Sequence, residues 1–127
     1  MSIFGTGCDI VEIERIKKAL KNKNFQKKIY SKNEIKAANT KSKKFSSYAK
    51  KFAAKEAFSK ALGTGISGGI SFKDIEVNSN KLGKPYIELH GKTKSIVQQT
   101  VKKRYKIFLT ISDEHKYALA MVIITYL

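Results

Sequence analysis

The sequence has little of several residue types, and each scarcity excludes a class of protein. Cys8 is the only cysteine, so no disulfide can form within the chain, which is typical of a reducing compartment. The longest apolar run, residues 117–124, is far too short to span a bilayer. A single proline and a hydrophobic content of 42% argue against low-complexity disorder. No basic segment followed by an apolar one opens the sequence, so we expect no secretory signal.

Acidic residues are scarce as well. Ten Asp and Glu face 26 Lys and Arg, which gives a formal net charge of +16. A field of this size attracts polyanions such as nucleic acid, an anionic membrane surface, phosphorylated ligands or an acidic protein. Only Arg15 and Arg104 are arginines, whereas specific readers of base edges depend on arginine. A general preference for lysine in the source genome is the alternative explanation.

The 127 residues correspond to one domain, residues 1–127, long enough to bury a core without disulfides or metals. Hydrophobic periodicity predicts an α+β fold with a mostly antiparallel sheet packed against a long central helix. We expect the final strand to be central and covered on both faces, because it is apolar on both. The predicted elements are a strand at 2–11 broken by a Gly-Thr-Gly turn, helices at 12–21, 31–38, 46–62 and 93–105, a hairpin at 70–89, and strands at 106–112 and 117–126.

Two further predictions concern the N-caps of these helices and the faces of helix 46–62. Ser31 is the predicted N-cap of helix 31–38, with Glu34 at the capping-box position, and Thr93 is the predicted N-cap of helix 93–105. In helix 46–62, Glu56 and Lys60 lie on one stripe with apolar residues, so this helix is expected to be enclosed on two sides. The residues of this helix expected to be exposed are Lys50, Lys51 and Lys55.

Three residues are candidates for phosphate and metal chemistry. Asp9 follows an apolar strand and precedes a helix, a place where ligands collect. With Glu56 it offers two hard oxygen ligands, the usual protein share of a Mg²⁺ site, and Lys60 can meet a phosphate. Simpler interpretations remain open: Asp9 as the N-cap of helix 12–21, and Glu56 with Lys60 as an i,i+4 helix pair.

The remaining motifs are weak on their own. The glycine-rich segment 63–69 does not match a P-loop, and a helix C-cap followed by a turn explains it equally well. Gly83-Lys84-Pro85 is an ordinary hairpin turn by composition. His90 and His115 lack the spacing of metal ligands, and Cys8 has no evident general base.

In combination, the segments resemble the bacterial holo-acyl-carrier-protein synthases, which are small-type 4′-phosphopantetheinyl transferases. The most specific part is an Asp in the first segment together with KEAFSKALGTGI in the second. The similar segments run in the family's order over nearly the whole chain: GTGCDIVEIERI at 5–16, KFAAKEAFSKALGTGI at 51–66, SFKDIEV at 71–77, LGKPYIEL at 82–89 and TISDEHKYALAMVII at 110–124.

The resemblance implies the phosphopantetheinyl transferase fold and a Mg²⁺-dependent reaction. It implies transfer of the 4′-phosphopantetheine arm of coenzyme A to a serine of apo-acyl carrier protein, with release of adenosine 3′,5′-bisphosphate, in fatty acid biosynthesis. It further implies a cytoplasmic homotrimer whose sites lie at subunit junctions, with no nucleic-acid or membrane partner.

The resemblance also implies roles for individual residues. Asp9 and Glu56 match the Mg²⁺ ligands, and Glu56 and Lys60 are the expected catalytic residues, with Glu56 accepting the serine proton. The expected coenzyme A-binding residues are Lys51, Ser59, Lys60, Gly63, Lys84 and Pro85. The residues expected to attract the acidic carrier protein are Arg15, Lys17, Lys18, Lys21 and Lys23, of which Arg15, Lys18 and Lys21 are the predicted contacts.

Two positions depart from the family pattern. Lys51 stands where the family usually has Arg, which keeps the charge but loses the bidentate fork. Asp113 stands where the family usually has His, and an Asp would repel phosphate unless it points away; His115 compensates only if the turn is rebuilt. These departures keep open an inactive family member, and the basic charge keeps open a nucleic-acid-binding module. The aromatic residues argue against the latter, because they follow core patterns.

Overall fold

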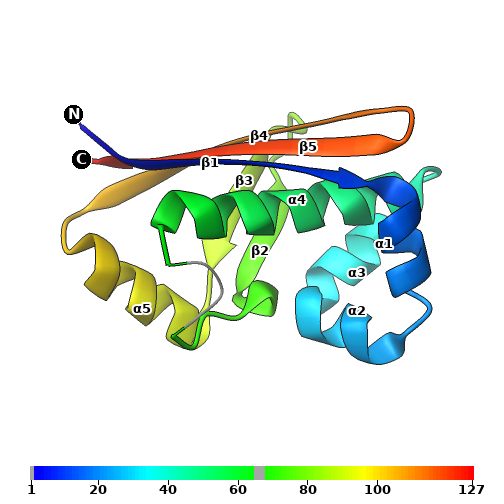
Figure 1. Ribbon diagram of the computed structural model, residues 1–127, viewed down its shortest axis with the longest axis horizontal. Helices are drawn as coiled ribbons and strands as arrows, with labels where there is room; N and C mark the ends of the chain where they lie inside the picture. The colour runs from blue at the N-terminus through cyan, green and yellow to red at the C-terminus, as the bar shows by residue number, and fades with distance from the viewer. Residues whose placement is uncertain (1, 65–67) are drawn as a thin grey trace.

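A computed structural model describes residues 2–64 and 68–127 and shows an α+β fold with two antiparallel sheets (Figure 1). The first sheet has the strand order β1-β5-β4, and β2 pairs with β3 in the second. No helix of this described part is long and apolar enough to cross a membrane. The elements in chain order are β1 (Ile3–Glu12), α1 (Ile13–Ala19), α2 (Lys23–Ile29), α3 (Lys32–Asn39), α4 (Lys44–Leu62), the 3₁₀ turn η1 (Phe72–Asp74), β2 (Ile75–Ser79), β3 (Pro85–Leu89), α5 (Gly91–Val101), β4 (Tyr105–Glu114) and β5 (Tyr117–Tyr126).

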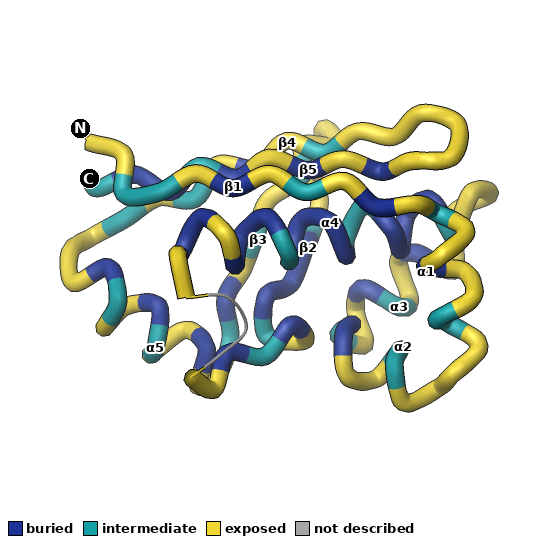
Figure 2. Tube along the Cα trace, in the orientation of Figure 1, coloured by how far each residue is buried: buried dark blue, intermediate teal, exposed yellow. Residues whose placement is uncertain are grey.

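Helix α4 is the centre of the molecule. It runs along one face of the three-stranded sheet, with α1, α2 and α3 gathered near its N-terminal end and α5 near its C-terminal end (Figure 1). The strands alternate between residues buried against α4 and exposed residues, and α4 itself is buried over most of its length (Figure 2). Gly63 ends the helix in the left-handed conformation, φ 88°, as the C-cap prediction requires.

Several local predictions are confirmed. The capping box of α3 is present, since the Ser31 side chain accepts from the Glu34 backbone and the Glu34 side chain accepts from the Ser31 backbone. The hairpin is present, although its first strand begins only at Ile75, after the 3₁₀ turn. The α+β fold with mostly antiparallel strands around a long central helix is also confirmed.

The predicted turn at Gly-Thr-Gly is wrong, because β1 continues through it. A side chain at Gly5 would fall on the carbonyl oxygen of Ala61, and one at Gly7 on that of Ala57. The glycines are therefore needed for the close approach of β1 to α4 and not for a reversal of the chain.

Other expectations at the helices are also corrected. Helix α2 was not predicted; it begins after Asn22, whose side chain accepts from the Asn24 amide. His90 and not Thr93 is the N-cap of α5, and the Thr93 hydroxyl instead accepts from the Ser71 amide. The prediction that Lys55 is exposed is wrong, because this lysine is fully buried.

The prediction for the final strand is half right. β5 is central in its sheet, between β1 and β4, but only the face toward α4 is covered in the single chain. On the other face Leu119 and Met121 remain 42% and 47% exposed. An apolar pattern on both faces of a strand therefore does not require that both faces are covered by the same chain.

Candidate functional site

The candidate site lies where β1 passes over the C-terminal half of α4. Because Gly5 and Gly7 let the strand approach the helix closely, Asp9 comes within reach of the helix surface. The Lys60 ammonium lies 3.1 Å from Asp9 Oδ1 and donates to the Cys8 carbonyl oxygen at 3.0 Å. Asp9 lies within β1, and Glu12 occupies the N-cap position of α1, so the N-cap interpretation of Asp9 is wrong.

Glu56 lies one helical turn before Lys60 on α4. Burial raises the pKa of the Glu56 carboxyl group, and the negative charge of Asp9 raises it further; Lys60 and Arg15 offset part of this effect. The two carboxylates therefore lie close enough to repel each other, with cations from α4 and α1 at the same place. This arrangement goes beyond a simple i,i+4 helix pair, because the ion pair of Lys60 is with Asp9.

This donor set suits a hydrated divalent cation. Asp9 and Glu56 supply two hard oxygen ligands from different elements, and their mutual repulsion is what a bound cation would remove. Beside Glu56 opens a largely apolar groove of about 430 Å³. The groove is lined by Lys28, Ile29, Phe52, Glu56, Ile70, Ser71 and Phe72.

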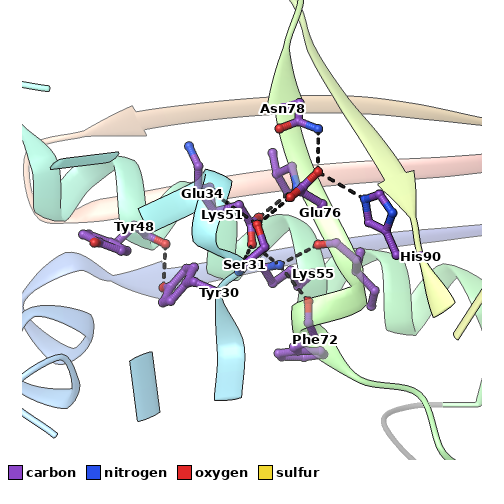
Figure 3. A network of polar contacts seen from close by, with 12 residues as sticks. Tyr30, Ser31, Glu34, Tyr48, Lys51, Lys55, Phe72, Glu76, Asn78 and His90 are labelled. Atoms are coloured by element: carbon purple, nitrogen blue, oxygen red, sulfur yellow. Dashed lines mark hydrogen bonds and ion pairs between the residues drawn. The ribbon is translucent and has the colours of Figure 1, made fainter. Parts of the chain in front are cut away.

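A polar network not anticipated from the sequence lies where α4 faces α3 and the start of β2 (Figure 3). Its buried part is an ion pair between Lys55 and Glu34, and its outer part contains Glu76 and His90. The only signal for this network in the sequence is the capping box of α3. The capping box predicts the position of Glu34 but does not predict that Lys55 pairs with it.

The outer part of this network includes a group of three potential metal ligands. Among the described residues, one ligand atom each from Glu76, Glu88 and His90 lies within 4.8 Å of the others. Glu76 and Glu88 are directly opposite in the β2–β3 pair, and His90 Nε2 lies 3.2 Å from the first carboxylate and 3.5 Å from the second. This group is compatible with a divalent metal.

Glu76 makes a testable contribution to stability. Burial raises the pKa of its carboxyl group, but hydrogen bonds from Ser31 and Asn78 and the contact with His90 together lower it below the ordinary value. The stabilisation is therefore present above the unfolded-state pKa and is lost as the pH falls through the folded-state pKa. We expect Glu76→Gln to lower the free energy of unfolding at pH 7 by about 1–3 kcal/mol, and the difference to shrink toward about pH 3.

Urea unfolding of wild type and Glu76→Gln at both pH values measures this effect. The matched control is Glu14→Gln, an exposed acid-to-amide change on α1. An equal loss at both pH values for Glu76→Gln would show that the carboxylate charge is not what stabilises the fold.

Comparison with known proteins identifies the family. Residues 5–122 match the model of the 4′-phosphopantetheinyl transferase superfamily. This chain belongs to that superfamily. A protein of Pelagibacter ubique named holo-[acyl-carrier-protein] synthase is 53% identical, and the match covers 98% of each chain.

Solved structures agree with this assignment. A holo-(acyl-carrier-protein) synthase from Bacillus anthracis, crystallised in complex with CoA (3′,5′-ADP), is 35% identical over 99% of each chain, with a TM-score of 0.81. The holo-[acyl-carrier-protein] synthase of Neisseria meningitidis is 36% identical over 97% of this chain and 98% of its own, with a TM-score of 0.86. The chain is thus a phosphopantetheinyl transferase of the holo-acyl-carrier-protein synthase group, and its fold is that of this group.

The residues that this transferase is expected to use for coenzyme A lie at several places in the single chain. Lys60 and Gly63 lie at the end of α4, and Ser59 beside them is buried, with a hydroxyl that has no partner among the described residues. Lys84 and Pro85 belong to the β2–β3 turn, and no hydrogen bond or ion pair among the described residues joins them to Asp9, Glu56 or Lys60. Part of the glycine-rich segment, residues 65–67, lies outside the described residues.

Lys51 and Asp113, the two residues expected to depart from the family pattern, both contact polar side chains of α4. Lys51 is half-buried and donates to Ser47 Oγ at 3.3 Å, and burial is the main reason that its pKa lies below the ordinary value. Asp113 accepts a hydrogen bond from Ser46 Oγ at 2.8 Å and lies 3.4 Å from Lys50 Nζ. This hydrogen bond, helped by the charge of Lys50, lowers the pKa of Asp113. The Asp113 carboxylate is therefore held against the N-terminal part of α4, and Lys50 partly neutralises its charge.

His115 lies at the tip of the turn between β4 and β5, with φ 51° and an exposed side chain. It borders a depression of about 680 Å³ that Lys41, Lys43 and Lys44 also line. These three lysines thus line the same depression as Asp113, the position at which the family resemblance predicts a histidine. Arg15, Lys18 and Lys21 are exposed. Arg15 acts electrostatically on Glu56 and so lies near the candidate site, whereas Lys21 lines a depression with Lys44 and Tyr48 toward the N-terminal end of α4.

Proposed function

We propose that residues 1–127 form one transferase domain that moves the 4′-phosphopantetheine group of coenzyme A onto a serine of apo-acyl carrier protein. Adenosine 3′,5′-bisphosphate is the second product. The observation that carries this proposal is the convergence of Asp9, Glu56 and Lys60 at one point in a chain of this family. The relative from Bacillus anthracis was crystallised with the corresponding donor, CoA (3′,5′-ADP).

Asp9 and Glu56 are the residues that would hold Mg²⁺, and the cation would supply charge neutralisation at the diphosphate. Glu56 accepts the proton of the attacking serine hydroxyl, a role that suits a carboxyl group whose pKa is raised by its surroundings. Lys60 offsets the charge that develops on the leaving bisphosphate. Arg15, Lys18 and Lys21 attract the acidic carrier protein to the same side of the molecule.

Coenzyme A binding would draw on Lys51, Ser59, Lys60, Gly63, Lys84 and Pro85. Since no hydrogen bond or ion pair of the described residues joins Lys84 and Pro85 to Asp9 and Glu56, the proposal includes a homotrimer in which sites form where subunits meet. The exposed apolar face of the three-stranded sheet supports this arrangement. Its exposed residues include Ile10, Phe108, Tyr117, Leu119 and Met121.

Disruption of this apolar face should dissociate the trimer. We expect Met121→Lys, in the centre of the face, to give a monomer that no longer transfers phosphopantetheine, because a charged side chain cannot be buried there unpaired. Size-exclusion chromatography with light scattering measures the mass. Leu82→Lys, a similar change at an exposed turn residue outside the sheet, should leave the mass unchanged. A wild-type monomer would contradict the trimer proposal, and a Met121→Lys trimer would show that this face of the sheet is not the interface.

The proposal includes a cytoplasmic location and a role in fatty acid biosynthesis. The role rests on the need of carrier proteins for the phosphopantetheine arm, which holds acyl chains as thioesters. The direct test is intact mass spectrometry of apo-acyl carrier protein after incubation with this chain, coenzyme A and Mg²⁺. We expect a gain of one phosphopantetheine that is absent with EDTA and with Glu56→Ala. No gain and no binding of coenzyme A would overturn the proposal, and salt-dependent RNA binding in its place would favour a nucleic-acid-binding module.

A further inference from the structure

Helix α4 carries Glu56, and its buried residues lie all around it. Its large apolar side chains, Tyr48, Phe52, Phe58 and Leu62, share one side of the helix, and the side toward β1 consists of small residues. Many of the buried positions are alanines, whose small side chains form a smooth surface with little interlocking. The alanines concerned are Ala49, Ala53, Ala54, Ala57 and Ala61.

Lys55 makes a fully buried, strongly directional contact on this helix. Its side chain is fully buried, and its ammonium donates to Glu34 Oε1 at 2.8 Å and to the Phe72 carbonyl oxygen at 2.7 Å. A third hydrogen bond goes to the carbonyl oxygen of Ile75 (Figure 3). All three protons of the ammonium therefore have acceptors, and these acceptors belong to α3, η1 and the start of β2.

Glu34 is itself held from two sides. Its Oε1 accepts from the Ser31 amide at 2.9 Å, and its Oε2 accepts from the Val77 amide at 2.8 Å. The carboxylate is fully buried, so both ends of the ion pair are fixed by backbone groups in a dry environment. The position of the Lys55 ammonium is thus set by α3 and by the β2 region.

The next residue after Lys55 is Glu56, and the helix carries both. A rotation of α4 by 20° would move a side-chain end about 2 Å, given the radius of a helix with its side chains. The same rotation would break hydrogen bonds to the buried ammonium and leave a charge without full compensation, which is strongly unfavourable. On the opposite side, Gly5 and Gly7 contact the backbone of α4 and fix its distance from β1.

We propose that the buried Lys55–Glu34 ion pair is a positioning device for the proposed reaction. Together with the large apolar side chains on the same side of the helix, it fixes the rotation of α4 and thereby holds the Glu56 carboxylate opposite Asp9, where both can bind a divalent cation. Lys55 and Glu34 touch neither substrate nor metal, so they are positioning residues, and the inference rests on the proposed function of Asp9 and Glu56.

The main test is the double variant Glu34→Gln/Lys55→Met, which removes both charges and leaves no unpaired ion. Circular dichroism checks that it is folded. We expect Mn²⁺ binding, followed by electron paramagnetic resonance, to weaken about tenfold or more, and kcat to fall about 100-fold, the usual cost of a displacement of about 1 Å. The KM for coenzyme A should rise as well, because Lys51, Ser59 and Lys60, three of the residues proposed to bind it, lie on the same helix.

Val97→Ala is the matched control, since it removes a fully buried side chain of α5 without touching the ion pair. It should lower the melting temperature but leave Mn²⁺ binding and kcat close to wild type. If the double variant does not fold, Glu34→Asp, which keeps both charges but withdraws the carboxylate by one methylene group, provides the comparison with a smaller change. Wild-type Mn²⁺ binding in a folded pair variant, or an equal loss in Val97→Ala, would overturn the inference. Absence of transfer by wild type would count against the proposed function, and Mn²⁺ binding would still test the positioning role.

Discussion

Gly7→Ala should destabilise the protein by about 3 kcal/mol, at the upper end of what overpacking a core costs. The added methyl group would fall on the backbone of α4, at the Ala57 carbonyl oxygen and 2.7 Å from the Ala61 nitrogen. Neither atom belongs to a flexible side chain, so strand and helix must move apart. Since Asp9 follows two residues later on the same strand, phosphopantetheine transfer should fall about 100-fold even where the variant is folded.

Urea unfolding and the mass-spectrometric transfer assay measure these two effects. Thr6→Ala is the control in the same strand, because the Thr6 side chain is exposed and the change should cost less than about 1 kcal/mol. A Gly7→Ala protein with wild-type stability and activity would show that the spacing between β1 and α4 is not set by this glycine.

The two glycines of β1 illustrate a limit of sequence reasoning. Glycine serves both for turns and for close approaches of the backbone, and a Gly-x-Gly pattern does not distinguish these uses. The turn interpretation was wrong because the element that approaches, α4, is about fifty residues further along the chain. Asp9 was a candidate partly because it was expected to follow a turn at the end of a strand, and this reason was wrong, since β1 continues through Asp9 to Glu12. The family resemblance indicated Asp9 independently.

Lys55 was misplaced for a related reason. A lysine in a helix is expected to be exposed unless a partner is known, and its partner Glu34 is 21 residues away in sequence. Local patterns placed the capping box of α3 correctly, because both of its residues lie within one turn. The apolar outer face of β5 is the same kind of case, with a partner that we propose to be another copy of the chain.

Glu56→Gln should abolish transfer and yet leave the metal-free protein at least as stable as wild type. Transfer should fall about a thousandfold or more, because an amide cannot accept the serine proton and is a weak ligand for a hard cation. Burial and the charge of Asp9 raise the pKa of Glu56, so the fold favours its neutral form. Stability from this group is therefore highest at low pH and decreases as the pH rises from the unfolded-state pKa through the raised folded-state pKa.

At neutral pH the Glu56 carboxylate is thus a cost to the fold that glutamine removes, and the melting temperature of Glu56→Gln without metal should equal or exceed that of wild type. Calorimetry without metal, combined with the transfer assay, separates this outcome from general damage. Glu14→Gln, an exposed acid-to-amide change on α1, should keep transfer within about twofold, since surface changes away from a site have small effects. A Glu56→Gln protein that is both less stable and partly active would mean that Glu56 supports the fold. The expected result, greater stability with lost transfer, would mean that this carboxylate is kept beside Asp9 for chemistry and at the expense of stability.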